Sequence, residues 1–272
     1  MTERTVLKDR FKGKVAIITG GSSGIGKATL EEICKEGAAA VFTGTRDTGH
    51  HIAREMTTAG YNVVYCQGDM ADEGFCKEVV AKTLDSFGKV HYLFNNAFSF
   101  TAKALDASRD DWERVWQVGP MAFALMGSLV TEPMRAQGGG SIVNMSSISA
   151  FIAQPNRWTY NTAKGAVHTL TKCMALDLAR YNIRVNSVSP AWIWTREVDN
   201  AAGGDRAKWE PVWGQYHMLE RCGEPVECAG PVLFLLSDDA SFITGADLPI
   251  DGGYESLGPE GLGKTSKFAG SK

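Results

Sequence analysis

Tyr160 and Lys164 are the first residues whose types and spacing indicate chemistry. They lie four positions apart in the run YNTAK, so a helix would place the phenol and the ammonium on one face. A nearby cation favours the phenolate, and a lowered phenol pKa suits proton exchange with an alcohol oxygen. Taken alone, such a pair is common by chance and most often belongs to a solvated helix face.

Ser147 adds a hydroxyl to this pair. It ends the run SIVNMSS and precedes Tyr160 by thirteen residues. If that run is a strand of a parallel sheet, Ser147 lies at a carboxyl end, where site residues gather. The sequence therefore predicts a catalytic site built from Ser147, Tyr160 and Lys164.

A glycine-rich segment, TGGSSGIG at residues 19–26, follows an apolar run and precedes a helical pattern. Glycines there let backbone amides approach a pyrophosphate at the positive end of a helix. The spacing is G-x-x-x-G-x-G rather than G-x-G-x-x-G, and a plain tight turn is the alternative interpretation. The expected contacts of this loop with a dinucleotide are Gly20, Ser22, Ser23, Gly24, Ile25 and Gly26.

These residues require elements that hold them, and the hydrophobic pattern alternates between strands and helices along the chain. Strands are expected at 14–19, 39–43, 62–66, 90–95, 141–145, 184–188 and 247–250. Helices are expected at 27–37, 48–59, 72–87, 109–136, 160–180 and 225–236. This alternation predicts an α/β fold: a doubly wound parallel sheet in a Rossmann-like three-layer sandwich. No linker divides the pattern, so residues 1–272 are expected to form a single domain.

Residues 191–220 interrupt the alternation with an insertion that holds Trp192, Trp194, Trp209 and Trp213. Connections of this length often act as lids or binding loops, so we expect a substrate lid that stacks on a planar molecule. A core or subunit contact is the alternative. The tail at 255–272 is expected to fray or to dock on a neighbour.

The amino-acid composition limits the classes of molecule that the protein is expected to bind. The chain has 272 residues, with 28 basic and 31 acidic side chains, a net charge of −3. Without a basic excess, neither nucleic acid nor an anionic membrane is an expected partner. The apolar stretch 118–130 is too short to span a bilayer, and the charged N-terminus lacks a secretory pattern, so a cytoplasmic location is expected. Six cysteines without a C-x-x-C pair suggest reduced, mostly buried thiols, and five histidines at no metal spacing suggest no catalytic metal.

Together these motifs resemble the short-chain dehydrogenase/reductases in their simple single-domain form. The resemblance also rests on the segment NNA at 95–97, on residues 190–195 and on the closing run IDGG at 250–253. It implies that Tyr160 is the general acid/base. Lys164 would lower the pKa of Tyr160 and hold the nicotinamide ribose, and Ser147 would orient the substrate carbonyl.

The resemblance implies further cofactor contacts along the strand ends. Asp69, beside Met70, would contact the adenine. The implied contacts nearer the nicotinamide are Asn96, Ala97, Pro190, Ile193 and Thr195, besides Tyr160 and Lys164.

Three positions depart from the family pattern. Phe98 stands where a glycine is usual, beside the expected nicotinamide path, and Ala191 replaces another glycine. Gly119 replaces the asparagine that anchors a water relay to the lysine. Pro120 disfavours a regular helix there, and we expect freed backbone groups of residues 115–117 to hold a replacement water. Gly119→Asn is then expected to change turnover by less than about tenfold.

The residues after the second strand decide between NAD and NADP. Thr45 takes the position of the acidic residue in NAD-preferring members, and Arg46 takes a position that often pairs with the 2′-phosphate of NADP. The adjacent Asp47 blurs this signal. We favour NADP over NAD.

The implied activity is an NAD(P)-dependent oxidoreductase that interconverts a secondary alcohol and a ketone. Sugars, sugar acids and other cyclic molecules are candidate substrates, and an inward-facing Arg157 would suit an anionic one, although a solvent-facing arginine is the alternative. The candidate substrate contacts are Phe98, Ser149, Arg157, Trp158, Trp192 and Trp194.

Two alternatives belong to other classes. A cofactor-binding pseudoenzyme or regulatory protein would have lost the relay with the asparagine, and a nucleic-acid-binding module conflicts with the net charge of −3. Family members usually pair through their long helices, so the resemblance implies a homo-oligomer, a tetramer or a dimer, assembled through 109–136 and 160–180.

Overall fold

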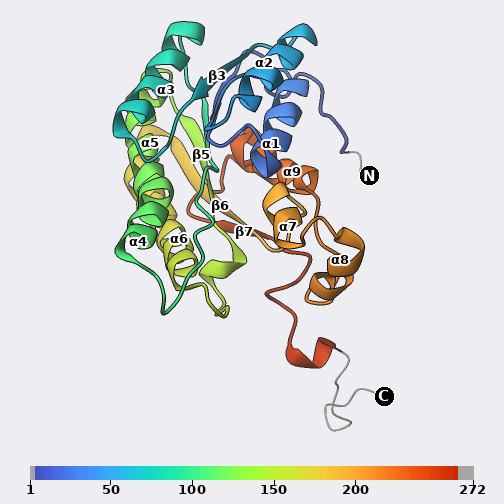
Figure 1. The fold of residues 1–272 in the computed structure, drawn as a ribbon. Coiled ribbons are helices and arrows are strands. Elements are labelled where there is room, and N and C mark those ends of the chain that lie inside the picture. The colour runs from blue at the N-terminus through green and yellow to red at the C-terminus, as the bar shows by residue number, and fades with distance from the viewer. Residues whose placement is uncertain (1–3, 263–272) are drawn as a thin grey trace.

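A computed structural model describes residues 4–262 and shows one seven-stranded parallel sheet between two layers of helices (Figure 1). The strand order is β3-β2-β1-β4-β5-β6-β7. The strands are β1 (Val15–Ile18), β2 (Ala39–Gly44), β3 (Val63–Gln67), β4 (Tyr92–Asn95), β5 (Gly140–Met145), β6 (Ile183–Pro190) and β7 (Asp247–Ile250). Each predicted strand is present, and the doubly wound α/β fold is confirmed.

Helices cover both faces of the sheet. They are α1 (Gly24–Lys35), α2 (Thr48–Thr58), α3 (Glu73–Phe87), α4 (Arg109–Trp116), α5 (Ala122–Ala136), α6 (Trp158–Leu178), α7 (Arg196–Ala201), α8 (Arg206–Gly214) and α9 (Pro225–Leu236). α3 to α6 lie on one side of the sheet, and α1, α2 and α9 lie on the other (Figure 1). Strands such as β1 are buried along their whole length because both faces are covered.

The order of the strands positions the site. From β1 the chain winds outward through β2 and β3, and it then returns to β4 on the other side of β1. Crevices form where the winding reverses, at the carboxyl ends of the strands. The loops that follow β1, β4 and β5 therefore converge at one edge of the sheet.

The helix predicted at 109–136 is interrupted. A π-helical turn, η1 (Gln117–Met121), separates α4 from α5, and Gly119 has a ψ of −107° inside it. Pro120 supplies no backbone donor at this point, and insertions of this kind kink helices. The expected distortion is thus present, and it lies beside the start of α6, with which η1 is in contact.

The insertion at 191–220 folds as the two short helices α7 and α8. Its tryptophans stack on one another around Trp213: the ring centroids of Trp192, Trp209 and Trp194 lie 4.7, 5.3 and 5.8 Å from that of Trp213. Of the expected tail, residues 259–262 form a 3-10 turn, and 263–272 lie outside the described residues.

The cysteines and the lengths of the apolar helices were also predicted from the sequence. Five of the six cysteines are buried free thiols and Cys173 is exposed. Within residues 4–262 no helix is both long and apolar enough to cross a membrane.

Candidate active site

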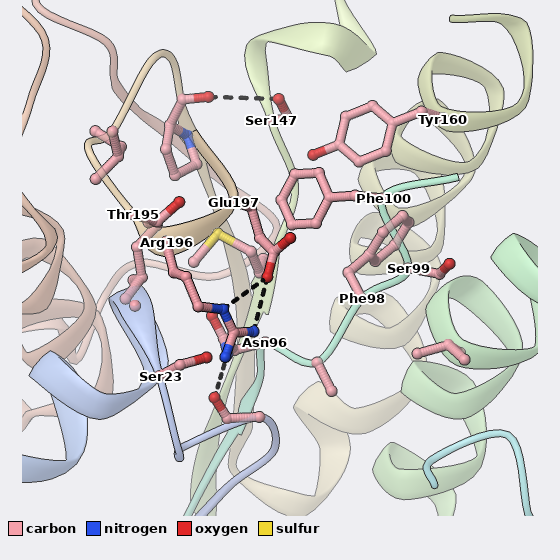
Figure 2. Close-up of a pocket in the computed structure, with 18 of the residues that line it drawn as sticks. Ser23, Asn96, Phe98, Ser99, Phe100, Ser147, Tyr160, Thr195, Arg196 and Glu197 are labelled. Atoms are coloured by element: carbon pink, nitrogen blue, oxygen red, sulfur yellow. Dashed lines mark hydrogen bonds and ion pairs between the residues drawn. The ribbon is translucent and has the colours of Figure 1, made fainter. Parts of the chain in front are cut away.

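A cleft of about 720 Å³ crosses the carboxyl edge of the sheet, from the glycine-rich loop to the insertion. Its walls come from the segments at the carboxyl ends of β1 to β6 and from the start of α6. Hereafter "the cleft" means this cavity. Figure 2 shows Ser23 and Asn96 at one end and Ser147 and Tyr160 at the other.

The glycine-rich loop is held tightly against the end of β4. Gly20 has a φ of +67°, which L side chains rarely adopt, and a Cβ on Gly26 would lie 2.3 Å from the Gly20 carbonyl oxygen. The amide Nδ2 of Asn96 donates to the carbonyls of Thr19 and Gly20, at 2.9 and 3.2 Å. Asn96 therefore fixes the loop, whose residues 22–25 line the cleft at the start of α1.

Ser147, Tyr160 and Lys164 are brought together as predicted from their positions, because β5 and α6 meet at the floor of the cleft. All three are buried, with Tyr160 6% and Lys164 1% exposed. The Ser147 hydroxyl contacts the Ser149 hydroxyl at 3.2 Å and the Pro190 carbonyl at 3.4 Å. Ser149 in turn donates to Gln154 at 2.7 Å.

The pKa of Tyr160 is the first electrostatic difference from the sequence-based expectation. Burial raises it to about 12, and the Ser147 hydroxyl and the Arg157 charge offset only part of that rise. The expected lowering by Lys164 is absent in this state. Tyr160 is therefore held as a neutral phenol, which is the form that can give up a proton.

The Lys164 Nζ makes its contacts with a backbone carbonyl and with a second aromatic ring. Nζ donates to the backbone carbonyl of Met145 at 2.7 Å and lies 3.6 Å from the centroid of the Phe98 ring. Its distance to the Tyr160 ring centroid is longer, 5.6 Å. Burial holds the pKa of Lys164 well below its usual range.

The end of β2 carries the residues that were expected to select the cofactor. Thr45 and Arg46 line the cleft and are exposed. Among the cleft arginines, Arg114 pairs with Asp69 at 2.6 Å and Arg196 with Glu197 at 2.7 Å. Arg46, by contrast, makes no ion pair with a carboxylate of residues 4–262, so its charge is available to a ligand.

Asp69 and Met70 line the cleft next to this end, as expected for the adenine side. The Asp69 carboxylate is already occupied on both oxygens, since it also accepts from the Ala71 amide at 3.0 Å. The Arg114 guanidinium and that amide hold its pKa below the usual range, against the effect of burial.

The segment after β6 closes the opposite wall, and Pro190, Ile193 and Thr195 all line the cleft. A bridge between Ile193 and Gly223 fixes this segment, with the Trp194 amide donating to Gly223 at 2.7 Å. The Thr195 side chain accepts from Val198 and caps α7. Thr195 also lies across from Gly24, so the wall reaches the glycine-rich loop.

Aromatic side chains form the end near Tyr160. Phe100, 58% exposed, stacks on the Tyr160 ring at 5.5 Å with an interplanar angle of 17° (Figure 2). Phe98 meets the same ring edge-on at 5.5 Å. Arg157 lines the cleft with its guanidinium 5.4 Å from the Trp192 ring centroid, so it is not the purely solvent-facing arginine of the alternative.

Two candidate substrate contacts, Trp158 and Trp194, lie outside the lining of the cleft. Trp158 is 52% exposed, and neither it nor Trp194 is among the described residues that line the cleft. Trp194 packs against Trp213 and under the Arg206 guanidinium, so the insertion uses its aromatics mainly for its own packing. Gly26 likewise serves packing, whereas Ser22, Ser23 and Ile25 line the cleft.

Several cleft residues were missed, namely Ser99, Phe100, Gln154, Arg196 and Glu197. Phe100 and Gln154 could have been found, because they lie in the loop after β4 and between Ser147 and Tyr160. The Arg196 and Glu197 pair carries no local signal. Within the described part of the chain no cluster of three or more potential metal ligands occurs.

Comparisons with known proteins identify relatives over most of the chain. A family profile described as "Enoyl-(Acyl carrier protein) reductase" matches residues 20–255. Cyclopentanol dehydrogenase of Comamonas sp. is 35% identical over 250 residues, which cover 90% of this chain and 98% of that protein. NADP-dependent (R)-specific alcohol dehydrogenase of Lentilactobacillus kefiri is 36% identical over 254 residues, with coverages of 91% and 99%.

A solved structure gives the same result. L-sorbose reductase from Gluconobacter frateurii, complexed with NADPH and L-sorbose, has a TM-score of 0.86 and 31% identity, covering 92% of this chain and all of that one. The family profile spans the glycine-rich loop from Gly20 onward and the Ser147, Tyr160 and Lys164 positions. The chain therefore belongs to the short-chain dehydrogenase/reductase family of oxidoreductases.

Proposed function

We propose that this protein is an NADP-dependent oxidoreductase that interconverts a cyclic secondary alcohol and its ketone. One observation carries the proposal: a single cleft joins the glycine-rich loop to the buried Tyr160 and Ser147 hydroxyls. A dinucleotide bound along the loop would present its reactive ring to a molecule held beside those hydroxyls.

The cofactor end fits a dinucleotide. Gly20 and Gly26 let the loop pack tightly against itself and against Asn96, and the loop residues Ser22 to Ile25 line the cleft, where their backbone could approach a pyrophosphate. Arg46 offers a cation without an ion-pair partner in residues 4–262, which supports recognition of a 2′-phosphate. When bound, the nicotinamide would give or accept the hydride.

Tyr160 supplies the proton in this proposal. During reduction its phenol gives the proton to the carbonyl oxygen as the hydride reaches the carbonyl carbon, and the Tyr160 oxygen becomes a phenolate. A Tyr160 pKa raised to about 12 keeps the phenol protonated at neutral pH, and the charge of Lys164 stabilises the phenolate once it forms. The Ser147 hydroxyl donates to the substrate oxygen and orients it.

The substrate end favours a ring. Phe98, Phe100 and Trp192 line it with aromatic surface, and Arg157 lies at the Trp192 ring. Aromatic walls suit the apolar faces of a cyclic molecule, and an anionic substituent could pair with Arg157. The similarity to a cyclopentanol dehydrogenase supports the same class.

The test is an NADPH oxidation screen over cyclopentanone, cyclohexanone, L-sorbose and a uronate. We expect turnover on at least one cyclic ketone, faster with NADPH than with NADH. NADPH binding without turnover on the whole panel would support the pseudoenzyme alternative, and faster turnover with NADH would contradict the cofactor assignment.

We also infer that copies of the chain associate through α4, α5 and α6. Two apolar side chains of this region are exposed in the single chain: Met121 in η1, between α4 and α5, and Leu176 in α6. Sedimentation at micromolar concentration should give a dimer or a tetramer, and a monomer would contradict this inference.

A further inference from the structure

Phe98 and Gly119 compete for one volume beside the floor of the cleft. A Cβ added to Gly119 would lie 2.5 Å from Cε2 and 2.8 Å from Cζ of the Phe98 ring. Real Cβ atoms do not make contacts this short, so the ring sits where it does because residue 119 carries no side chain. Phe98 and Gly119, two of the three departures from the family pattern, thus form one structural feature.

The same ring faces the ammonium of Lys164. Nζ lies 3.6 Å from the ring centroid and donates to the Met145 carbonyl at 2.7 Å. Within residues 4–262 Lys164 pairs with no carboxylate, although it is almost fully buried. The negative face of an aromatic ring attracts a cation, most strongly where water is excluded. The Phe98 ring and the Met145 carbonyl are therefore the groups in contact with the Lys164 Nζ.

Neighbouring rings hold Phe98 in place. Its ring meets Tyr160 edge-on at 5.5 Å and Phe123 of α5 at 6.2 Å, with interplanar angles of 81° and 77°. A ring packed in this way has little freedom to turn its face from Lys164. The ring is thus in contact with three elements: α5 through Phe123, η1 through Gly119, and α6 through Tyr160 and Lys164.

We propose that Phe98 is a positioning residue for Lys164: its ring face, which fits only because Gly119 has no side chain, holds the Lys164 Nζ at the cleft floor and favours its charged form against the effect of burial. The proposal rests on the proposed function, because it matters for catalysis only if Lys164 contacts the nicotinamide ribose and the phenolate of Tyr160. It also changes one sequence-based expectation. Gly119→Asn would displace the Phe98 ring, so we now expect it to lower turnover more than tenfold rather than less.

The test must separate the ring's electrostatic face from its bulk. Replacing Phe98 with 4-fluoro-, 3,5-difluoro- and 3,4,5-trifluorophenylalanine withdraws charge from the ring face in steps and hardly changes its shape. We expect the dissociation constant of NADPH to rise and kcat to fall at each step. The cation–π range corresponds to a total change between about twofold and thirtyfold.

Lys164→Met provides the matched control, with NADPH binding as the readout because this variant should not turn over. The fluorine series should be flat in that background, since the charge that the ring face senses is gone. A series that falls equally with and without the Lys164 charge would overturn the proposal, and so would a flat series in the wild-type background.

A second experiment displaces the Phe98 ring without changing its chemistry. Gly119→Ala should push the Phe98 ring from Lys164 and weaken NADPH binding, whereas in Phe98→Leu the added Cβ should cost little more, because leucine lacks the atoms it would touch. Additive effects would overturn the proposal. Failure of the proposed function looks different: the wild-type protein would then not bind NADPH, or would bind it without turnover while the fluorine series still reports on Lys164.

Discussion

The two ends of the cleft are built in different ways. At the cofactor end, backbone atoms of one short segment do most of the work: Gly20 and Gly26 touch, and Asn96 ties their loop to β4. At the substrate end, side chains from distant segments meet, as Phe100 stacks on Tyr160 and Arg157 on Trp192. A backbone cradle tolerates little change, whereas a wall of side chains can vary and so sets the substrate. Each end should therefore fail separately.

Tyr160→Phe should have the largest effect. It removes only the transferable proton, so kcat should fall by about 10²–10⁴-fold while the dissociation constant of NADPH changes little. Steady-state rates and a fluorescence titration of NADPH measure the two quantities. A variant that keeps a substantial part of the wild-type kcat would remove Tyr160 from its role.

Arg46→Ala should break the cofactor end alone. Loss of a charge-assisted pair to phosphate, roughly 1.5–3 kcal/mol, should weaken NADPH about 10–150-fold and leave NADH almost unchanged. Arg54→Ala is the matched control, because Arg54 is an exposed arginine of α2 outside the cleft. Equal weakening of both cofactors would reverse the assignment of NADP.

The sequence predicts the features that depend on local patterns. Periodicity predicts the strands and helices, helix spacing pairs Tyr160 with Lys164, and the convergence of strand ends places Ser147 beside them. The sequence does not predict how side chains from separate elements pack. No local pattern shows that the Phe98 ring fills the space at Gly119, that Lys164 turns toward that ring, or that Trp194 faces Trp213 instead of the cleft.

Trp213→Leu should weaken the substrate end and spare the cofactor end. Trp213 stacks with Trp192, the one tryptophan of this cluster that lines the cleft among the described residues. Lost stacking is worth about 0.5–1.5 kcal/mol, so KM for the ketone should rise about two- to tenfold at constant NADPH affinity. Trp158→Leu, at an exposed tryptophan outside the cleft, should leave KM unchanged. A Trp213 variant with unaltered KM would show that the insertion does not shape the substrate end.

Glu255→Gln should have the smallest effect, and it should change the free energy of unfolding rather than either end of the cleft. Burial, with Asp251 and Asp247 nearby, raises the pKa of Glu255 from 4.5 to about 7. Because the folded state then holds a proton that the unfolded state has released, the free energy of unfolding falls as pH rises from about 4.5 to 7. The variant removes this loss, so its melting temperature should exceed the wild-type value at pH 8.5 by about 2–4 °C for each kcal/mol regained. The gain should be smaller at pH 5, and a gain independent of pH would contradict the assigned pKa.

Hydride transfer is the central claim, and isotopic labelling tests it most directly. NADPH that carries deuterium at both hydrogen positions of nicotinamide C4 is incubated with the wild-type protein and the panel of cyclopentanone, cyclohexanone, L-sorbose and a uronate, and the products are analysed by mass spectrometry and NMR. We expect an alcohol with deuterium on its carbinol carbon, formed by the wild-type protein and about 10²–10⁴-fold more slowly by Tyr160→Phe. An unlabelled alcohol, or no alcohol from any member of the panel, would contradict it.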